Sequence, residues 1–177
     1  LIKLPKTISC RYNPGGSFVL GNSIMDKPSE AKYGFTLPQI IEGFKILAQR
    51  GVEHFGLHAF LASNMLDNDY YPTLARTLFE TAVQVQRETG VHLSYLNLSG
   101  GIGIPYHPGE EPCDIAYIGR RVQQAFDEVL VPAGLGGVRI VTELGRYMTG
   151  AHGHLIARAT HEKNTYKDYI GLDACAV

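Results

Sequence analysis

The sequence has few cysteines, no excess of either charge and no long apolar run, and each absence excludes a class of protein. Cys10, Cys113 and Cys175 are odd in number and widely spaced, which is typical of reduced cytoplasmic thiols and argues against a disulfide framework. The formal net charge of −1 predicts no electrostatic attraction to nucleic acid or to an anionic membrane. No apolar run approaches the roughly 20 residues that span a bilayer, and no secretory signal is recognisable. We therefore expect a cytoplasmic globular protein.

Two kinds of segment alternate along the chain. Apolar residues recur at helical spacing in residues 36–51, 69–89 and 114–131. Short apolar runs of the kind that form buried strands lie before and after these stretches: TISCRYN, EHFGLHAF, HLSYLNL and VRIVTEL. This alternation is typical of a parallel sheet in an α/β protein, and we expect crossover helices to bury both faces of the sheet.

The predicted helices have recognisable ends. Thr36, Asp69 and Asp114 are the residue types that cap helix N-termini, and each stands at the start of a periodic stretch. Gly51 and Gly90 suit the left-handed position that ends a helix. The local chemistry therefore supports three separate helices.

The pattern changes after Gly150, where two strands joined by a polar turn around Asn164 are predicted without a helix. We expect residues 1–150 to form one domain and residues 151–177 to begin a second domain rich in β-strands. The chain starts without methionine and stops after an apparent strand, so we expect it to be a piece of a longer protein. Residues 15–32 form a long polar loop, a kind that is often functional.

The unusual residues follow the carboxyl ends of the predicted strands, where α/β folds bind ligands. Ser99-Gly100-Gly101 lacks the features of a Walker loop or a dinucleotide fingerprint. Consecutive glycine N–H groups can cradle an anion such as phosphate, but a tight turn shaped by packing explains them equally well. Glu143 could bind a protonated ring nitrogen and Arg146 a phosphate or carboxylate, or the two could form a structural ion pair.

Other candidates at the strand ends have weaker signals. Phe60 could belong to the core or stack on a flat ring. His58 is interpreted as a satisfied structural residue, and Lys32 as a surface lysine. His152 and His154 lack a third ligand at suitable spacing, so we expect no metal site.

Six segments together resemble the decarboxylases dependent on pyridoxal 5′-phosphate (PLP) that are built on the alanine-racemase-like barrel, and most of all the diaminopimelate decarboxylase branch. These segments are ISCRYNPGG, SEAKYGF, FGLHAFLASN, LNLSGGIGIPY, TELGRYMTG and GLDACAV, in the family's order. The resemblance implies part of a PLP-binding (β/α)8 barrel, about four βα units forming its C-terminal half within residues 1–150. The first strands of a β-rich C-terminal domain would follow.

The resemblance also implies roles for individual residues. Glu143 would be catalytic and keep the pyridine nitrogen protonated, and Arg146 would bind the cofactor phosphate or the substrate carboxylate. Ser63, Ser99, Gly100 and Gly101 would hold the phosphate. The complete set of implied cofactor-binding residues is Phe60, Ser63, Ser99, Gly100, Gly101, Glu143, Gly145 and Arg146.

The chain departs from the family pattern at several positions. Phe60 stands where the family has a histidine stacked on the cofactor, and Ala62, Ser99 and Leu144 replace family glycine, glycine and proline. None of the seven lysines lies in the motif that carries the family's Schiff-base lysine. This chain alone is therefore predicted to be inactive.

The predicted parent activity is the conversion of meso-2,6-diaminopimelate to L-lysine and CO2, a step of lysine biosynthesis, by a homodimer. Alternatives keep the chemistry and change the amino-acid substrate to ornithine, arginine or carboxynorspermidine. Two others change the class of protein: a non-catalytic PLP or phosphate carrier on the same barrel, or a phosphosugar-binding barrel enzyme of unrelated chemistry.

Overall fold

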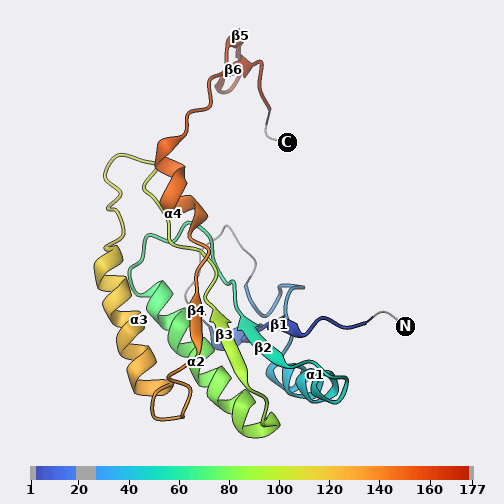
Figure 1. Ribbon diagram of the computed structural model, residues 1–177. Helices are drawn as coiled ribbons and strands as arrows, with labels where there is room; N and C mark the ends of the chain where they lie inside the picture. The colour runs from blue at the N-terminus through green and yellow to red at the C-terminus, as the bar shows by residue number, and fades with distance from the viewer. Residues whose placement is uncertain (1–2, 19–26, 176–177) are drawn as a thin grey trace.

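A four-stranded parallel sheet forms the body of the protein, seen in a computed structural model that describes residues 3–18 and 27–175. Strands β1 (Thr7–Arg11), β2 (His54–His58), β3 (Leu93–Asn97) and β4 (Arg139–Val141) lie side by side in chain order. Helices α1 (Leu37–Gln49), α2 (Tyr70–Thr89) and α3 (Ile115–Val129) connect them (Figure 1). The predicted α/β alternation is confirmed, although β4 is shorter than the run VRIVTEL.

The predicted helix ends are largely confirmed. The Thr36 N–H donates to Oε1 of Gln39 at 2.9 Å, and the Asp114 carboxylate accepts from the Tyr117 N–H at 2.8 Å. Gly90 ends α2 with a φ of 69°. Asp69 stands at the start of α2, but its carboxylate accepts from the Tyr117 hydroxyl at 3.2 Å and does not cap the helix. Local sequence therefore determined the helix boundaries more closely than the capping contacts.

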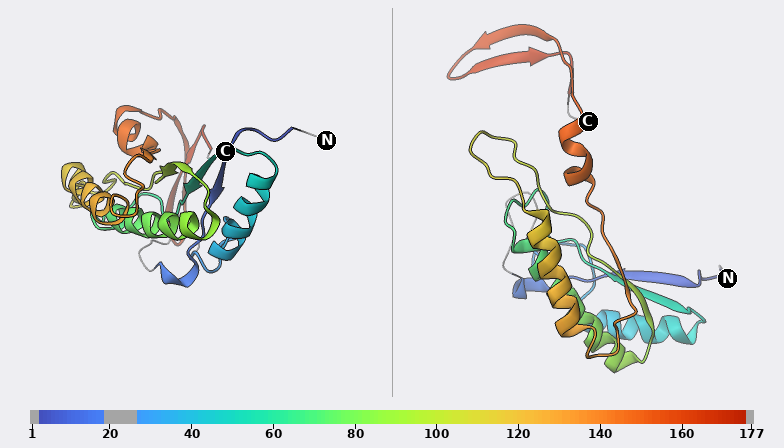
Figure 2. Two further views of the ribbon diagram at one scale, coloured as in Figure 1. Left: turned by 60° about the horizontal axis from the view of Figure 1, so that its bottom comes forward. Right: turned by 60° about the vertical axis from the view of Figure 1, so that its left-hand side comes forward.

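The three helices cover one face of the sheet, so the expectation that both faces are buried by helices is wrong (Figure 2). Phe55, Leu57 and Leu96 are buried in the core beneath the helices. Successive side chains of a strand point to opposite faces, so every second residue lies on the other face. Strand register places two rows there: Ser9, Gly56, Tyr95 and Arg139, and then Arg11, His58, Asn97 and Val141. Polar side chains in these rows are incompatible with burial under a helix.

The segment after β4 leads away from the sheet (Figure 1). A short helix α4 (Gly145–Thr149) and a 3-10 turn (Gly150–His152) come first. An antiparallel hairpin of β5 (Ala159–Asn164) and β6 (Asp168–Leu172) follows, which confirms the two predicted strands. Of the predicted loop 15–32, residues 19–26 lie outside the described residues. Across 3–18 and 27–175, no helix combines the length and apolarity needed to cross a membrane.

Candidate functional site

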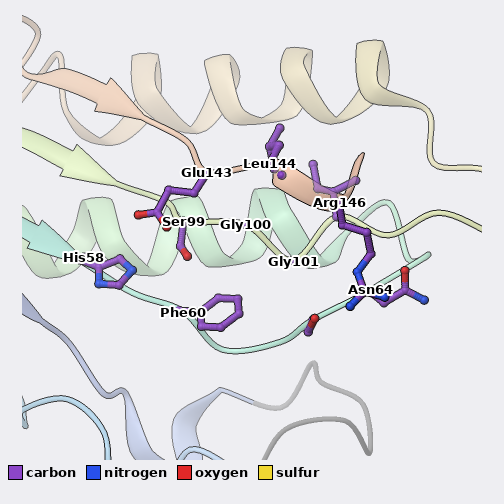
Figure 3. A pocket seen from close by; sticks show the side chains of 12 residues that line it. His58, Phe60, Asn64, Ser99, Gly100, Gly101, Glu143, Leu144 and Arg146 are labelled. Carbon is purple, nitrogen blue, oxygen red and sulfur yellow. The ribbon is translucent and has the colours of Figure 1, made fainter. Parts of the chain in front are cut away.

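A pocket of about 330 Å³ lies beyond the carboxyl ends of β2, β3 and β4 (Figure 3). These three strand ends are adjacent because the sheet is parallel and follows chain order. The pocket brings together all the residues predicted from sequence to bind a cofactor: Phe60, Ser63, Ser99, Gly100, Gly101, Glu143, Gly145 and Arg146. Its other lining residues are His58, Asn64, Ile102 and Leu144. The predicted gathering is observed, while the individual roles stay predictions.

Glu143 and Arg146 do not form the ion pair that was the alternative interpretation. Oε1 of Glu143 accepts a hydrogen bond of 2.5 Å from Nδ2 of Asn97. Nη1 of Arg146 donates to the Tyr106 hydroxyl at 3.1 Å, and its guanidinium lies 5.7 Å from the centre of that ring. Figure 3 shows the two charged groups at opposite ends of the pocket. The pocket therefore presents a negative charge at one end and a positive charge at the other.

The glycines of the Ser99 segment allow two strand ends to approach closely. A Cβ atom on Gly100 would lie 2.7 Å from the carbonyl oxygen of Glu143. Gly101 has a φ of +113°, and a Cβ atom there would lie 2.8 Å from the carbonyl oxygen of Ala62. Packing thus explains both glycines, and the same packing forms the wall of the pocket. A side chain at either position would disturb that wall.

Ser99 itself adopts a left-handed conformation with a φ of 57°, which is uncommon for a residue other than glycine. Its carbonyl oxygen accepts from the Tyr71 hydroxyl at 2.9 Å and from the Glu143 N–H at 2.8 Å. Its N–H donates to Oδ1 of Asn97 at 2.8 Å. The surrounding hydrogen bonds therefore hold the segment in this conformation.

Phe60 forms a wall of the pocket and does not belong to the buried core. Its ring faces the pocket in Figure 3. The Arg11 guanidinium lies 5.6 Å from the ring centre, and Nη2 of Arg11 donates to the Phe60 carbonyl oxygen at 2.8 Å. An aromatic face is thus held at the strand end by a contact with β1.

His58 also lines this pocket, contrary to its interpretation as a satisfied structural residue. Its Nε2 atom is buried without a hydrogen-bond partner among the described residues. Burial lowers the pKa of His58, the Glu143 carboxylate opposes this change, and Arg11 adds to it. The imidazole is therefore neutral near pH 7. Lys32 is exposed beside Tyr33 and does not line the pocket, as the sequence predicted.

Asn97, Asn64 and Tyr71 contribute to the site and were missed from the sequence. Asn97 is the last residue of β3, and strand alternation from Tyr95 could have placed it on the polar face. Asn64 accepts from the Ile104 N–H at 3.0 Å. Tyr71 comes from the buried side of α2, and burial first, then Tyr70 and Glu143, raises the pKa of its hydroxyl. No local sequence signal separates Tyr71 from other core residues.

Residues 6–150 match the family described as pyridoxal-dependent decarboxylase, pyridoxal binding domain. The chain belongs to this family. The cofactor of the family is pyridoxal phosphate, as the sequence resemblance implied. The matched region contains every residue of the pocket.

Known relatives agree with this assignment. Diaminopimelate decarboxylase of Methanothermobacter thermautotrophicus is 33% identical over 144 residues, which cover 81% of this chain and 34% of that protein. Protein TabA of Pseudomonas amygdali pv. tabaci is 29% identical over 178 residues, covering 98% of this chain and 40% of that protein. The chain thus spans about 40% or less of the length of these relatives.

Solved structures show the same fold. A diaminopimelate decarboxylase structure superimposes with a TM-score of 0.74 at 22% identity, covering 95% of this chain and 39% of that one. The Helicobacter pylori enzyme complexed with L-lysine gives a TM-score of 0.72 at 22% identity, covering 95% and 40%. The parallel sheet with helices on one face is therefore part of the (β/α)8 barrel of the PLP decarboxylases, as predicted, and the hairpin belongs to the β-rich region that follows.

Proposed function

We propose that this chain supplies the cofactor-binding part of a PLP-dependent amino-acid decarboxylase that converts meso-diaminopimelate to L-lysine and CO2. The observation that carries the proposal is the pocket in which Glu143 and Arg146 stand at opposite ends of a glycine-walled cavity. The family assignment and the 33% identity to a diaminopimelate decarboxylase support the reaction and its substrate.

The residues of the pocket fit pyridoxal phosphate. The volume of about 330 Å³ lies at the lower end of the ~300–1,000 Å³ range of small-molecule sites. The cofactor has a basic ring nitrogen and a phosphate on different sides of a flat ring. A carboxylate at one end, a guanidinium at the other and an aromatic face between them complement that pattern of charge and shape.

Each residue has a defined task in this proposal. Glu143 accepts a hydrogen bond from the protonated ring nitrogen. Arg146 binds the phosphate or the substrate carboxylate, while Ser63, Ser99 and the glycine N–H groups hold the phosphate. Phe60 covers the ring face and excludes water from it. Bound pyridoxal phosphate supplies an electron sink for the electron pair that remains when CO2 leaves.

The organisation of the whole protein forms part of the proposal. We place residues 1–150 in the C-terminal half of the barrel and residues 151–177 at the start of the β-rich domain, in a homodimeric parent enzyme. None of the described lysines lines the pocket, so we expect this chain alone to be inactive. The exposed Leu155, Ile156 and Tyr166 near the hairpin support packing against further protein. A monodisperse monomer of the isolated chain in size-exclusion chromatography would count against this organisation.

The activity is tested by measuring CO2 release from the full-length protein loaded with PLP. Separate samples receive meso-diaminopimelate, ornithine, arginine or carboxynorspermidine. Release from diaminopimelate alone is the expected result. Release from another amino acid alone would refute the substrate and keep the cofactor site, whereas no release from any would favour a non-catalytic carrier.

A further inference from the structure

Asn97, at the end of β3, contacts both the carboxylate of Glu143 and the backbone of the Ser99 segment. We infer that Asn97 is a positioning residue, which fixes the distance between the carboxylate that faces the cofactor ring nitrogen and the segment that holds the phosphate. The inference rests on the proposed function, because it assigns the two ends of the cofactor to these two groups.

The geometry uses both ends of the Asn97 amide. Nδ2 donates to Oε1 of Glu143 at 2.5 Å, and Oδ1 accepts from the Ser99 N–H at 2.8 Å. The Glu143 N–H donates back to the Ser99 carbonyl oxygen at 2.8 Å and closes the cycle. An amide has distinct donor and acceptor ends, so two such bonds determine its orientation. Asn97 therefore locks the ends of β3 and β4 in one arrangement.

This lock adds a constraint that the strands alone do not supply. Ser99 has a φ of 57°, a conformation that a residue other than glycine holds only when its surroundings determine it. On the other side, the Asn97 bond occupies only one oxygen of Glu143. Oε2 takes no hydrogen bond among the residues that the structure describes. That oxygen remains to accept from a ring nitrogen.

An aspartate at position 97 would act differently from asparagine. Ionised, it could still accept from the Ser99 N–H, but it would repel Glu143. Protonated, it would donate to Glu143 and reproduce the asparagine contacts. Other groups that face Glu143 are His58 from β2, Tyr71 from α2 and Arg146 on its own segment. Because they are unchanged in a variant at position 97, a new step in its pH profile reports on the pair formed by the introduced aspartate and Glu143.

The first test uses pyridoxamine 5′-phosphate, which needs no covalent bond to a lysine, with the full-length protein between pH 5 and 9. Asn97→Asp should bind the probe best at low pH, because two contacting carboxylates share a proton and the pKa of the pair rises. Its affinity should fall about tenfold or more as pH rises through that pKa, the range expected for losing a hydrogen bond to a charged group. The wild-type protein should lack this step.

Asn64→Asp is the matched control, since it adds the same charge to the same pocket and keeps an acceptor for the Ile104 N–H. Its effect should lack the step produced by the shared proton. A purely electrostatic role would instead strengthen probe binding in Asn97→Asp as the second carboxylate ionises beside the protonated ring. That result, or a pH profile identical to the wild type, would overturn the inference.

The second test needs no cofactor. Hydrogen exchange at the Ser99 N–H should be about tenfold or more faster in Asn97→Ala, the factor expected for loss of a stabilising hydrogen bond. The double variant Asn97→Asp with Glu143→Gln should retain protection, because the introduced aspartate can accept from both the Ser99 N–H and the new amide. Unchanged protection in Asn97→Ala, or lost protection in a folded double variant, would contradict the positioning role. If the wild-type protein fails to bind the probe, the proposed function fails, while this exchange measurement still decides the role of Asn97.

Discussion

The substitution Gly100→Ala tests the close approach of β3 and β4 that builds the pocket. The added Cβ atom would lie 2.7 Å from the carbonyl oxygen of Glu143, and a backbone atom cannot move aside as a flexible side chain can. The φ of Gly100 lies outside the left-handed region, so the cost is one of overpacking and not of backbone strain. Overpacking of this kind destabilises proteins by about 1–3 kcal/mol.

Thermal and urea denaturation of the full-length protein measure this cost. For a domain of about 150–250 residues, 2 kcal/mol corresponds to a fall in melting temperature of about 4–8 °C. Affinity for pyridoxamine 5′-phosphate should fall as well, because the displaced segment carries Ser99 and Glu143 is its neighbour.

Gly145→Ala is the matched control in the same pocket. A Cβ atom at position 145 meets nothing within 4 Å, and the residue begins helix α4, where alanine is favoured over glycine. Its stability should be unchanged or slightly raised. Equal stability of Gly100→Ala and Gly145→Ala would refute the reasoning that steric contact with β4 requires glycine at position 100.

Three further predictions concern the site and the core beneath it. Glu143→Gln keeps a group that can bond Asn97 but removes the charge, so CO2 release should fall on the order of a hundredfold, with the absorption of bound cofactor shifted to the unprotonated ring; unchanged absorption would contradict the role of Glu143. Phe60→Ala should weaken pyridoxamine 5′-phosphate binding about two- to tenfold by removing an aromatic contact, whereas Phe60→Tyr should retain it; equal affinities would place the ring outside the binding surface. Burial raises the pKa of Tyr70 from 10.0 to about 12, so the unfolded chain ionises first and the free energy of unfolding should fall as pH rises from 10 towards 12. Tyr70→Phe should flatten that part of a pH-dependent denaturation series, and an unchanged slope would argue against this effect.

The sequence by itself determined the local elements and their order. Helical periodicity and end residues such as Thr36, Asp114 and Gly90 act within a few positions, and the structure confirms the elements they predicted. Six short motifs in family order also pointed to PLP and to the residues that meet in one pocket. This succeeded because parallel strands bring their carboxyl ends to a common edge, so the loops after them need no further information to become neighbours.

Tertiary structure decided which groups touch within that pocket. Asn97 and Glu143 are 46 residues apart, and their contact depends on the register of β3 against β4, which no local pattern contains. The same register kept Glu143 away from Arg146, left Nε2 of His58 without a partner among the described residues and placed polar rows on the face that helices were expected to cover. Sequence patterns report the preferences of single segments, whereas partners, burial and charge separation arise only when several segments pack together, and for that reason the positioning role of Asn97 became visible only in the folded protein.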